Sequence, residues 1–303
     1  MEPARASALA REVTDILHMA ADTRFGAPLD ALRAVNVAGA EHTLAFANRC
    51  PKLARLLTFS TVYVAGRCSG TVYEHDAEHE AGFVNEYERS KYESEERFRG
   101  AMASMPVAIA RLSTIVGRAA DGVVARPGAI HHALRFYYQS LAPMLPGTPS
   151  SPVDLISLEY AADAGAAMLG RAYDPGATWH IAAGHDAPSL ESLLTLTRDC
   201  FLRFRPAWRR RAIEKPAIVS LRTFDRFADS VEELQSSVLS RCVASIRPFA
   251  PQLAYPKVFD DRNARAALET CGIARPAFDT YYPSVVKHLI ETHWSRGDEV
   301  TAS

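Results

Sequence analysis

Short apolar runs alternate with longer amphipathic runs between residues 15 and 183. This alternation restricts the set of possible folds more than any other pattern in the sequence. The apolar runs predict strands at Asp15–Ala21, Ala54–Ser60, Pro106–Leu112, Val153–Ile156 and Thr178–Ala183. The amphipathic runs predict helices at Leu29–Arg49, Glu86–Ala103 and Glu159–Ala172. Strands that alternate with helices are joined by crossover connections and run parallel, so the pattern predicts a three-layer α/β domain.

The last third of the chain has a different character, because strand patterns mostly disappear after Leu190. Apolar residues recur there at helical spacing in the ranges Leu193–Leu202, Pro216–Val243 and Asn263–Leu268. We expect Asp260 or Asp261 to cap the last of these helices, and prolines such as Pro283 to interrupt the segment.

Two domains are therefore expected. Residues 1–117 and 153–190 are predicted to form the sheet domain. Residues 118–152 and 191–303 are predicted to form a mainly helical cap that packs near the ligand-binding face of the sheet.

Composition excludes several classes of protein. Apolar residues make up 48% of the 303 residues and the net charge is −1, which argues against a protein that coats nucleic acid. No apolar run approaches the ~20 residues of a membrane-spanning helix, and the charged start lacks a secretion signal. The five cysteines are scattered without a CxxC pair. We therefore expect a cytoplasmic protein with reduced thiols, no disulfide framework and no metal site.

Tyr87 and Lys91 form the most informative pair in the sequence. They lie four residues apart in a predicted helix, so their side chains project from the same face on successive turns. A lysine ammonium held there favours the tyrosinate and lowers the pKa of the tyrosine, which makes the phenol a usable acid or base. Taken alone, the same spacing is common on solvated helix surfaces.

Two hydroxyl groups precede this helix. Ser60 and Thr61 stand at the end of a predicted buried strand, and ligands of open parallel sheets bind beyond the carboxyl ends of the strands. A hydroxyl there can hydrogen-bond the oxygen that Tyr87 protonates. A further predicted strand leads into Arg111 and Gly117, and this ordered set favours an active site over a solvated helix face.

At these residues the sequence resembles the extended short-chain dehydrogenase/reductase family, the NAD-dependent epimerase/dehydratase superfamily. It is most similar to the branch of male-sterility-type fatty acyl reductases and thioester reductases. The resemblance runs with gaps from about Val13 to about Leu194. Its motifs are Leu17-His18-Met-Ala-Ala21, Asn36-Val-Ala-Gly39, Ser60-Thr61-Val-Tyr-Val-Ala-Gly66, Asn85-Glu-Tyr87-Glu-Arg-Ser-Lys91 and Arg111-Leu-Ser-Thr-Ile-Val-Gly117. It implies an incomplete Rossmann-like parallel sheet, without its first strands, and a mainly helical C-terminal substrate cap.

The resemblance also implies roles. Tyr87 would be the acid or base, Lys91 its partner and a ribose ligand, and Thr61 the ligand of the substrate oxygen. The residues implied to bind the cofactor are Ala20, Ala21, Asn36, Ser60, Tyr87, Lys91, Ser113, Thr114 and Ile115. That cofactor would be NADP or NAD, with NADPH favoured only through the branch. Leu112 departs from the family, which usually has proline there.

The Gly-rich turn of the family does not occur in the sequence. Neither G-x-G-x-x-G nor G-x-x-G-x-x-G is found, and fourteen residues precede the strand at Asp15. We expect either a start assigned downstream of the true one or a decayed gene. In both cases we expect the printed chain to bind the dinucleotide poorly, and the edge of its first strand to invite aggregation.

Two other signals are better explained without a special function. His75 and His79 lie in an acidic loop and lack the His-Glu-x-x-His pattern of zinc proteases. The basic segment 203–211 contains interleaved aromatic residues, and we interpret it as a solvated face. Its functional alternative is contact with the phosphates of coenzyme A or of a carrier protein. No Gly-x-Ser-x-Gly motif supports a serine hydrolase.

Three functions remain open at this point. The first is an NAD(P)-dependent oxidoreductase that transfers hydride to a carbonyl or acyl thioester, on a small-molecule, coenzyme A or carrier-protein substrate and without nucleic acid. The second is a nucleotide-sugar epimerase or dehydratase, or a sterol-type dehydrogenase. The third is a non-catalytic remnant that cannot bind cofactor. An apolar cap favours the first function over a sugar-nucleotide site. The aromatic residues that favour it are Phe136, Tyr137, Tyr138, Phe224 and Phe227.

Overall fold

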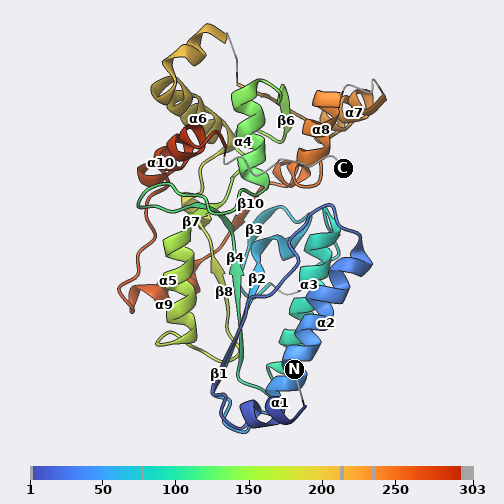
Figure 1. Cartoon of the computed structure of the whole chain (residues 1–303), viewed down its shortest axis with the longest axis vertical. Helices are drawn as coiled ribbons and strands as arrows, with labels where there is room; N and C mark the ends of the chain where they lie inside the picture. The colour runs from blue at the N-terminus through green and yellow to red at the C-terminus, as the bar shows by residue number, and fades with distance from the viewer. Residues whose placement is uncertain (1–2, 77, 212–214, 234–236, 295–303) are drawn as a thin grey trace. The chain divides into compact units, whose positions relative to one another are not determined.

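In the computed structural model, residues 3–76, 78–211, 215–233 and 237–294 are described, and they form two compact units (Figure 1). The first unit holds the residues up to Ser113, Tyr160–Gly184 and Phe259–Ala274. The second holds Thr114–Glu159, His185–Val258 and the residues from Arg275 onward. Each unit is therefore assembled from segments that lie far apart in the sequence.

A four-stranded parallel sheet with the order β1-β2-β4-β8 forms the centre of the first unit. Its strands are β1 (Asp15–His18), β2 (Arg55–Thr61), β4 (Val107–Leu112) and β8 (Thr178–Ile181). The helices α2 (Leu29–Ala47) and α3 (Glu86–Ala101) lie on one face, and α5 (Leu158–Leu169) lies on the other (Figure 1). The predicted α/β fold with a parallel sheet is confirmed.

The middle strands are covered on both faces, which explains their nearly continuous apolar sequence. Leu56 of β2 and Val107 and Ile109 of β4 have no exposed surface. On the α5 side, a Cβ atom added to Gly165 would lie 2.5 Å from the ring of Phe59. Glycine at this position therefore lets α5 pack directly on β2.

The remaining elements of the first unit surround this sheet: α1 (Pro3–Ala10), η1 (Val62–Ala65), β3 (Gly70–Val72) and α9 (Arg262–Glu269). The buried Glu74 carboxylate joins α9 to β8, because it accepts hydrogen bonds from the backbone N–H groups of His180 (3.0 Å), Asn263 (2.9 Å) and Ala264 (2.9 Å). Asp261 is the N-cap residue, as predicted, but its side chain makes no capping bond. The Asp260 carboxylate accepts the N–H of the first helical residue, Arg262, at 3.4 Å, and Glu74 accepts the next two.

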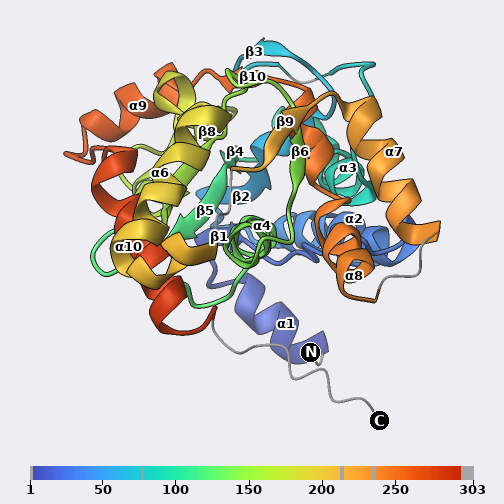
Figure 2. The same ribbon diagram turned by 90° about the horizontal axis from the view of Figure 1, so that it is seen from above.

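The second unit is mainly helical and contains two pairs of parallel strands. β5 (Thr114–Gly117) pairs with β7 (Leu155–Ser157), and β6 (Met144–Pro146) lies beside β9 (Ala217–Val219), as Figure 2 shows. Its helices are α4 (Ala129–Gln139), α6 (Leu190–Phe204), η3 (Pro206–Arg211), α7 (Leu221–Glu233), α8 (Ser237–Ile246), η4 (Ala250–Ala254) and α10 (Phe278–Glu291). Two short elements, η2 (Gly184–Asp186) and β10 (Lys257–Phe259), span boundaries between the units.

Helix α10 supplies much of the hydrophobic core of the second unit. Tyr282, Val285 and Leu289 are fully buried and belong to the same cluster as Phe201 of α6. Pro283 lies inside this helix, so the prediction that it interrupts the segment is wrong. The buried face of the helix outweighs the backbone hydrogen bond that proline cannot donate.

The bounds of the units differ from the predicted domains at three places. Residues 114–117 pair with residues 155–157 in the second unit, whereas the sequence predicts both segments in the sheet domain. Residues 185–190 also belong to the second unit, although they are predicted in the sheet domain. Residues 259–274, predicted in the cap, join the first unit through the bonds to Glu74.

The five cysteines all lie in the described ranges, and none of them forms a disulfide bond. Among the helices of those ranges, none is both long enough and apolar enough to cross a membrane.

Candidate active site

Tyr87 and Thr61 meet at the carboxyl end of the sheet in the first unit. Thr61 is the last residue of β2, and Tyr87 lies in the first turn of α3. The Thr61 side chain lies close enough to the Tyr87 phenol to lower its pKa. Lys91 follows one helical turn after Tyr87, and only 5% of its surface is exposed. The structure thus brings the three predicted catalytic residues together around the end of β2.

The start of α3 is fixed by a reciprocal cap around Tyr87. The Asn85 Oδ1 atom accepts the backbone N–H of Glu88 at 3.0 Å, and Glu88 Oε2 accepts the N–H of Val84 at 3.0 Å. The Asn85 amide also donates to Glu88 Oε1 at 3.1 Å. An asparagine followed three residues later by a glutamate is a sequence signature of this cap. It holds the turn that carries Tyr87 in one place.

Lys91 reaches back to β2. Its ammonium donates a hydrogen bond to the backbone carbonyl oxygen of Phe59 at 3.0 Å. Burial lowers the pKa of Lys91 to about 8, although the nearby Glu95 carboxylate opposes this shift. The same ammonium adds to the effect of burial in lowering the pKa of His18, the last residue of β1.

The phenol of Tyr87 is less acidic than the sequence predicts. Burial raises the pKa of Tyr87, the Glu88 carboxylate raises it further, and the nearby Thr61 side chain opposes both. Tyr87 is only 9% exposed, and the Lys91 ammonium is directed to the Phe59 carbonyl. The prediction that Lys91 lowers the pKa of Tyr87 is therefore wrong for this structure, and the Tyr87 phenol is neutral.

Asn36 supports the site from α2. Its Nδ2 atom donates to the backbone oxygen of Asp22 at 3.0 Å and to Ser90 Oγ at 2.9 Å, and its Oδ1 atom accepts the backbone N–H of Asp22 at 2.7 Å. The Ser90 hydroxyl in turn donates to the backbone oxygen of Tyr87 at 2.8 Å. The side chain is 1% exposed. Asn36 thus links the segment after β1 to α3.

Four other predicted cofactor residues lie at the same sheet edge. Ala20 and Ala21 follow the carboxyl end of β1, and Ala20 is exposed. Ser60 is buried in the penultimate position of β2. Ser113 follows β4 and donates its backbone N–H to the oxygen of Ile181 at 3.0 Å.

The last two predicted cofactor residues are placed elsewhere. Thr114 and Ile115 open β5, which belongs to the second unit. The structure therefore gathers the other predicted site residues in one unit without these two.

A buried ionic group behind the site was not predicted. The Arg111 guanidinium of β4 binds the Glu95 carboxylate of α3, with an NH2–Oε1 distance of 2.7 Å, and both side chains are at most 2% exposed. Arg111 NH1 also donates to His180 Nε2 at 3.1 Å. Arginine only donates, so His180 Nδ1 carries the proton and donates to the Asp260 carbonyl oxygen at 2.9 Å. Burial and the Arg111 charge lower the pKa of His180 to about 3.

This group ties three elements together directly behind the site. Glu95 lies one turn after Lys91 on α3, and in the sheet Arg111 stands between Ser60 and His180. Tyr87, Lys91 and Glu95 are spaced four residues apart, so they lie on one face of α3. This spacing is the sequence signal that places Glu95 beside the site.

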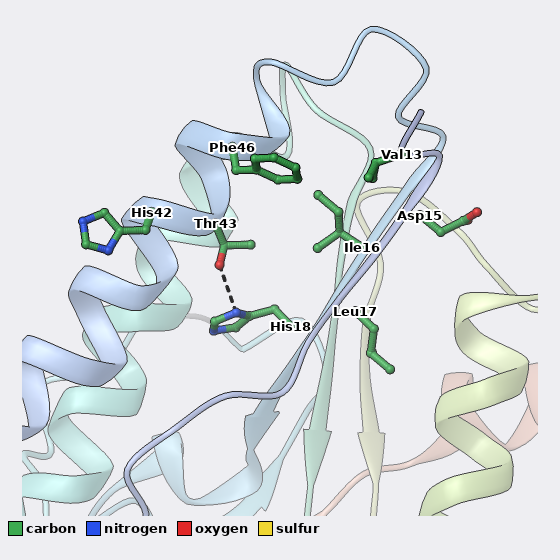
Figure 3. Close-up of a pocket in the computed structure, with 8 residues that line it drawn as sticks. All are labelled: Val13, Asp15, Ile16, Leu17, His18, His42, Thr43 and Phe46. Atoms are coloured by element: carbon green, nitrogen blue, oxygen red, sulfur yellow. Dashed lines mark hydrogen bonds between the residues drawn. The ribbon is translucent and has the colours of Figure 1, made fainter. Parts of the chain in front are cut away.

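A cavity of about 460 Å³ lies between β1 and α2 (Figure 3). Its lining residues are Val13, Asp15, Ile16, Leu17, His18, His42, Thr43 and Phe46. The Thr43 hydroxyl oxygen and His18 Nδ1 are 3.1 Å apart at its lower end, where the figure draws them facing each other. None of the three catalytic candidates lines this cavity, so the cavity is not part of the candidate active site.

The histidines of the acidic loop have local partners. His79 Nε2 donates to the backbone oxygen of Val64 at 2.7 Å, and His75 lies 3.7 Å from the Asp76 carboxylate. In the part of the chain that the structure describes, no group of three or more histidine, cysteine or acidic side chains is arranged to hold a metal ion.

Comparison with known proteins places these features in a family. Residues 1–165 match the family model of the male sterility protein, which describes an NAD-binding domain. Among curated proteins, none matches the chain.

Several solved structures share the fold. The terminal R domain from the myxalamid PKS-NRPS biosynthetic pathway is 19% identical with a TM-score of 0.76, over 99% of this chain and 73% of that one. A thiolation-reductase di-domain from an archaeal non-ribosomal peptide synthetase is 19% identical with a TM-score of 0.71, over 97% of this chain and 61% of that one. The UDP-glucuronic acid 4-epimerase from Bacillus cereus, in complex with NAD, is 14% identical with a TM-score of 0.63, over 95% and 78%.

Proposed function

This chain belongs to the male sterility protein family of NAD-binding proteins, and we propose that it reduces a carbonyl group, with an acyl thioester as the substrate class. The observation that carries the proposal is the meeting of Tyr87 and Thr61 at the carboxyl end of a parallel strand, with Lys91 one turn away. A nicotinamide cofactor supplies the hydride when it is bound. The residues of this chain supply the proton and orient the reacting oxygen.

The donor groups suit the ribose end of a nicotinamide cofactor. The Lys91 ammonium has three N–H donors, one of which is used by the Phe59 oxygen, so others can bind ribose hydroxyls. The Tyr87 hydroxyl stands one helical turn before it. We propose NADPH on the resemblance to the acyl reductase branch.

The protonation state of Tyr87 favours reduction. A carbonyl oxygen that receives hydride at its carbon develops negative charge, and a neutral phenol can donate a proton to it. The Thr61 hydroxyl can hydrogen-bond the same oxygen, because it already lies against the Tyr87 hydroxyl. In this proposal, Tyr87 is the general acid and Thr61 orients the substrate oxygen.

The thioester assignment rests on the branch resemblance and on likeness to the two reductase structures above. Within the second unit, Tyr137 and Tyr138 pack in one hydrophobic cluster, and Phe136 and Phe224 in another. The cap is thus rich in apolar side chains, which suits an acyl group better than a sugar nucleotide. Coenzyme A and carrier-protein thioesters are the proposed forms of the substrate.

Turnover of NADPH with acyl-CoA tests the proposal. Tyr87→Phe removes only the hydroxyl and is expected to lower kcat by at least about 100-fold, the usual contribution of a general acid. Tyr92→Phe is the matched control on the same helix, because its ring packs on His79 and Phe83 and it is expected to stay active.

Two results would contradict the proposal. Unchanged turnover in Tyr87→Phe would exclude Tyr87 as the acid. Absence of turnover by the folded wild-type chain with acyl-CoA, acyl carrier protein and UDP-sugars would favour the non-catalytic alternative.

A further inference from the structure

A short loop between β1 and α2 covers the Tyr87 phenol. The loop comprises residues 19–28, and the ring of Phe25 stands edge-on to the ring of Tyr87, with centroids 5.1 Å apart and an interplanar angle of 77°. Ala27 and Leu32 complete the same small hydrophobic cluster. An aromatic edge-to-face contact of this kind is specific in geometry as well as apolar. The loop therefore contributes directly to the burial of Tyr87.

The loop has a defined conformation. The backbone N–H of Ala27 donates to the oxygen of Arg24 at 3.3 Å, so Phe25 and Gly26 form the corner of a tight turn. The Asp22 carboxylate accepts the backbone N–H of Arg24 at 3.1 Å and pairs with its guanidinium at 2.6 Å. These contacts set the direction in which Phe25 projects.

Asn36 fastens the loop to the active-site helix. As described above, its side-chain amide holds both backbone polar groups of Asp22 and also binds Ser90, whose hydroxyl binds the Tyr87 carbonyl. A buried amide that uses donor and acceptor atoms on two elements joins them in one arrangement. The loop and the turn that carries Tyr87 are thus connected twice, through Asn36 and through the rings of Phe25 and Tyr87.

We infer that Phe25 is a positioning residue, whose ring keeps water from the Tyr87 phenol and holds its hydroxyl near Thr61. Asn36 anchors the loop that carries Phe25 through its hydrogen bonds. This inference rests on the proposed function, because the phenol must be a proton donor for the shielding to matter. A phenol kept from water stays neutral, since burial disfavours the charged form. Exclusion of water also strengthens the interaction of the phenol with charge that develops on a substrate oxygen.

Chemical nitration of the folded protein tests the shielding without turnover. Tetranitromethane nitrates phenols that are ionised and accessible, and peptide mapping reports the extent at each tyrosine. Phe25→Ala is expected to raise the nitration rate of Tyr87 by about tenfold, because one unit of pKa changes the ionised fraction tenfold. Phe25→Leu keeps an apolar cover and is expected to stay close to wild type. Should Phe25→Ala fail to fold, Phe25→Ser replaces it and is expected to give the same increase.

The control is Phe46→Ala. Phe46 is a partly buried aromatic residue of α2 in the same unit, and it lines the cavity beside β1 rather than the Tyr87 site (Figure 3). Its replacement is expected to leave the nitration of Tyr87 unchanged. Equal nitration in wild type and Phe25→Ala, or an equal increase in Phe46→Ala, would overturn the inference.

A second readout separates this inference from the proposed function. In an active chain, Phe25→Ala is expected to lower kcat, leave KM for the nicotinamide cofactor unchanged and move the alkaline limb of the pH profile to lower pH. If Tyr87→Phe remains active, the proposed function fails while the nitration result still decides whether Phe25 shields the phenol. If Tyr87→Phe is inactive and Phe25→Ala keeps the wild-type pH profile, the positioning role alone fails.

Discussion

The Lys91 ammonium donates its hydrogen bond to the carbonyl oxygen of Phe59, 3.0 Å away, and so ties α3 to the end of β2 one turn after Tyr87. The contact places a cation in an almost fully buried position. Burial accounts for its lowered pKa, and the lysine therefore carries a cost in stability that depends on pH.

The stability of the protein is expected to rise relative to Lys91→Met between about pH 8 and about pH 10.5. The pKa of Lys91 is about 8 in the folded chain against 10.5 ordinarily, so the unfolded chain binds more protons in this window. Below it the full cost of the buried charge is present. The relative gain across the window is expected to reach about 3 kcal/mol. Urea unfolding of both proteins over this range measures it, and a pH-independent difference would contradict the assignment.

Loss of Arg111 is expected to destabilise the first unit strongly. Arg111→Met leaves the buried Glu95 carboxylate without its main partner, which costs about 3–5 kcal/mol. Arg111→Met combined with Glu95→Met is expected to recover most of this loss, because it removes both charges. Chemical denaturation gives the free energies of unfolding.

A matched exposed pair provides the control for this experiment. Arg97 of α3 binds Glu41 of α2 at 3.0 Å, and both side chains are about half exposed. Arg97→Met is expected to change the free energy of unfolding by no more than about 1 kcal/mol. A similar cost for both arginine variants would show that the buried group has no special importance.

Gly165→Ala is expected to destabilise the protein by about 1–3 kcal/mol, although alanine usually favours a helix. The added Cβ atom would lie 2.5 Å from the ring of Phe59, so α5 or β2 must move. Gly100→Ala in α3 is the control, because nothing lies within 4 Å of its added Cβ atom. That variant is expected to be neutral or stabilised by up to about 1 kcal/mol, and the opposite order of melting temperatures would refute the packing argument.

The site could be predicted from local rules but its electrostatics could not. Helical spacing placed Tyr87 and Lys91 on one face, and the strand-end rule placed Thr61 nearby. The pKa of Tyr87 depends on burial, to which Phe25 contributes from a separate loop. The partner of Lys91 is a backbone oxygen, which no residue type reveals.

Tertiary packing explains why the sequence did not predict a continuous helix around Pro283 in the second unit. Pro283 indicates a break when the sequence is read locally, yet Tyr282 and Val285 beside it are buried in the core. Their burial is a property of the assembled unit, to which Phe201 of α6 contributes. Strands as short as β6, with three residues, carry too little pattern to be identified.

The bonds from Glu74 to Asn263 and Ala264 join positions 189 and 190 residues apart. The ribosome synthesises Glu74 long before α9. The whole stretch from His185 to Val258 therefore emerges before α9 can pack against the first unit. Until then the Glu74 carboxylate lacks its α9 partners, and the edge of β8 lacks its final cover. Completion of the first unit is therefore a late, long-range event that follows most of translation, and a nascent chain stalled before residue 259 holds all four strands of the sheet but lacks α9.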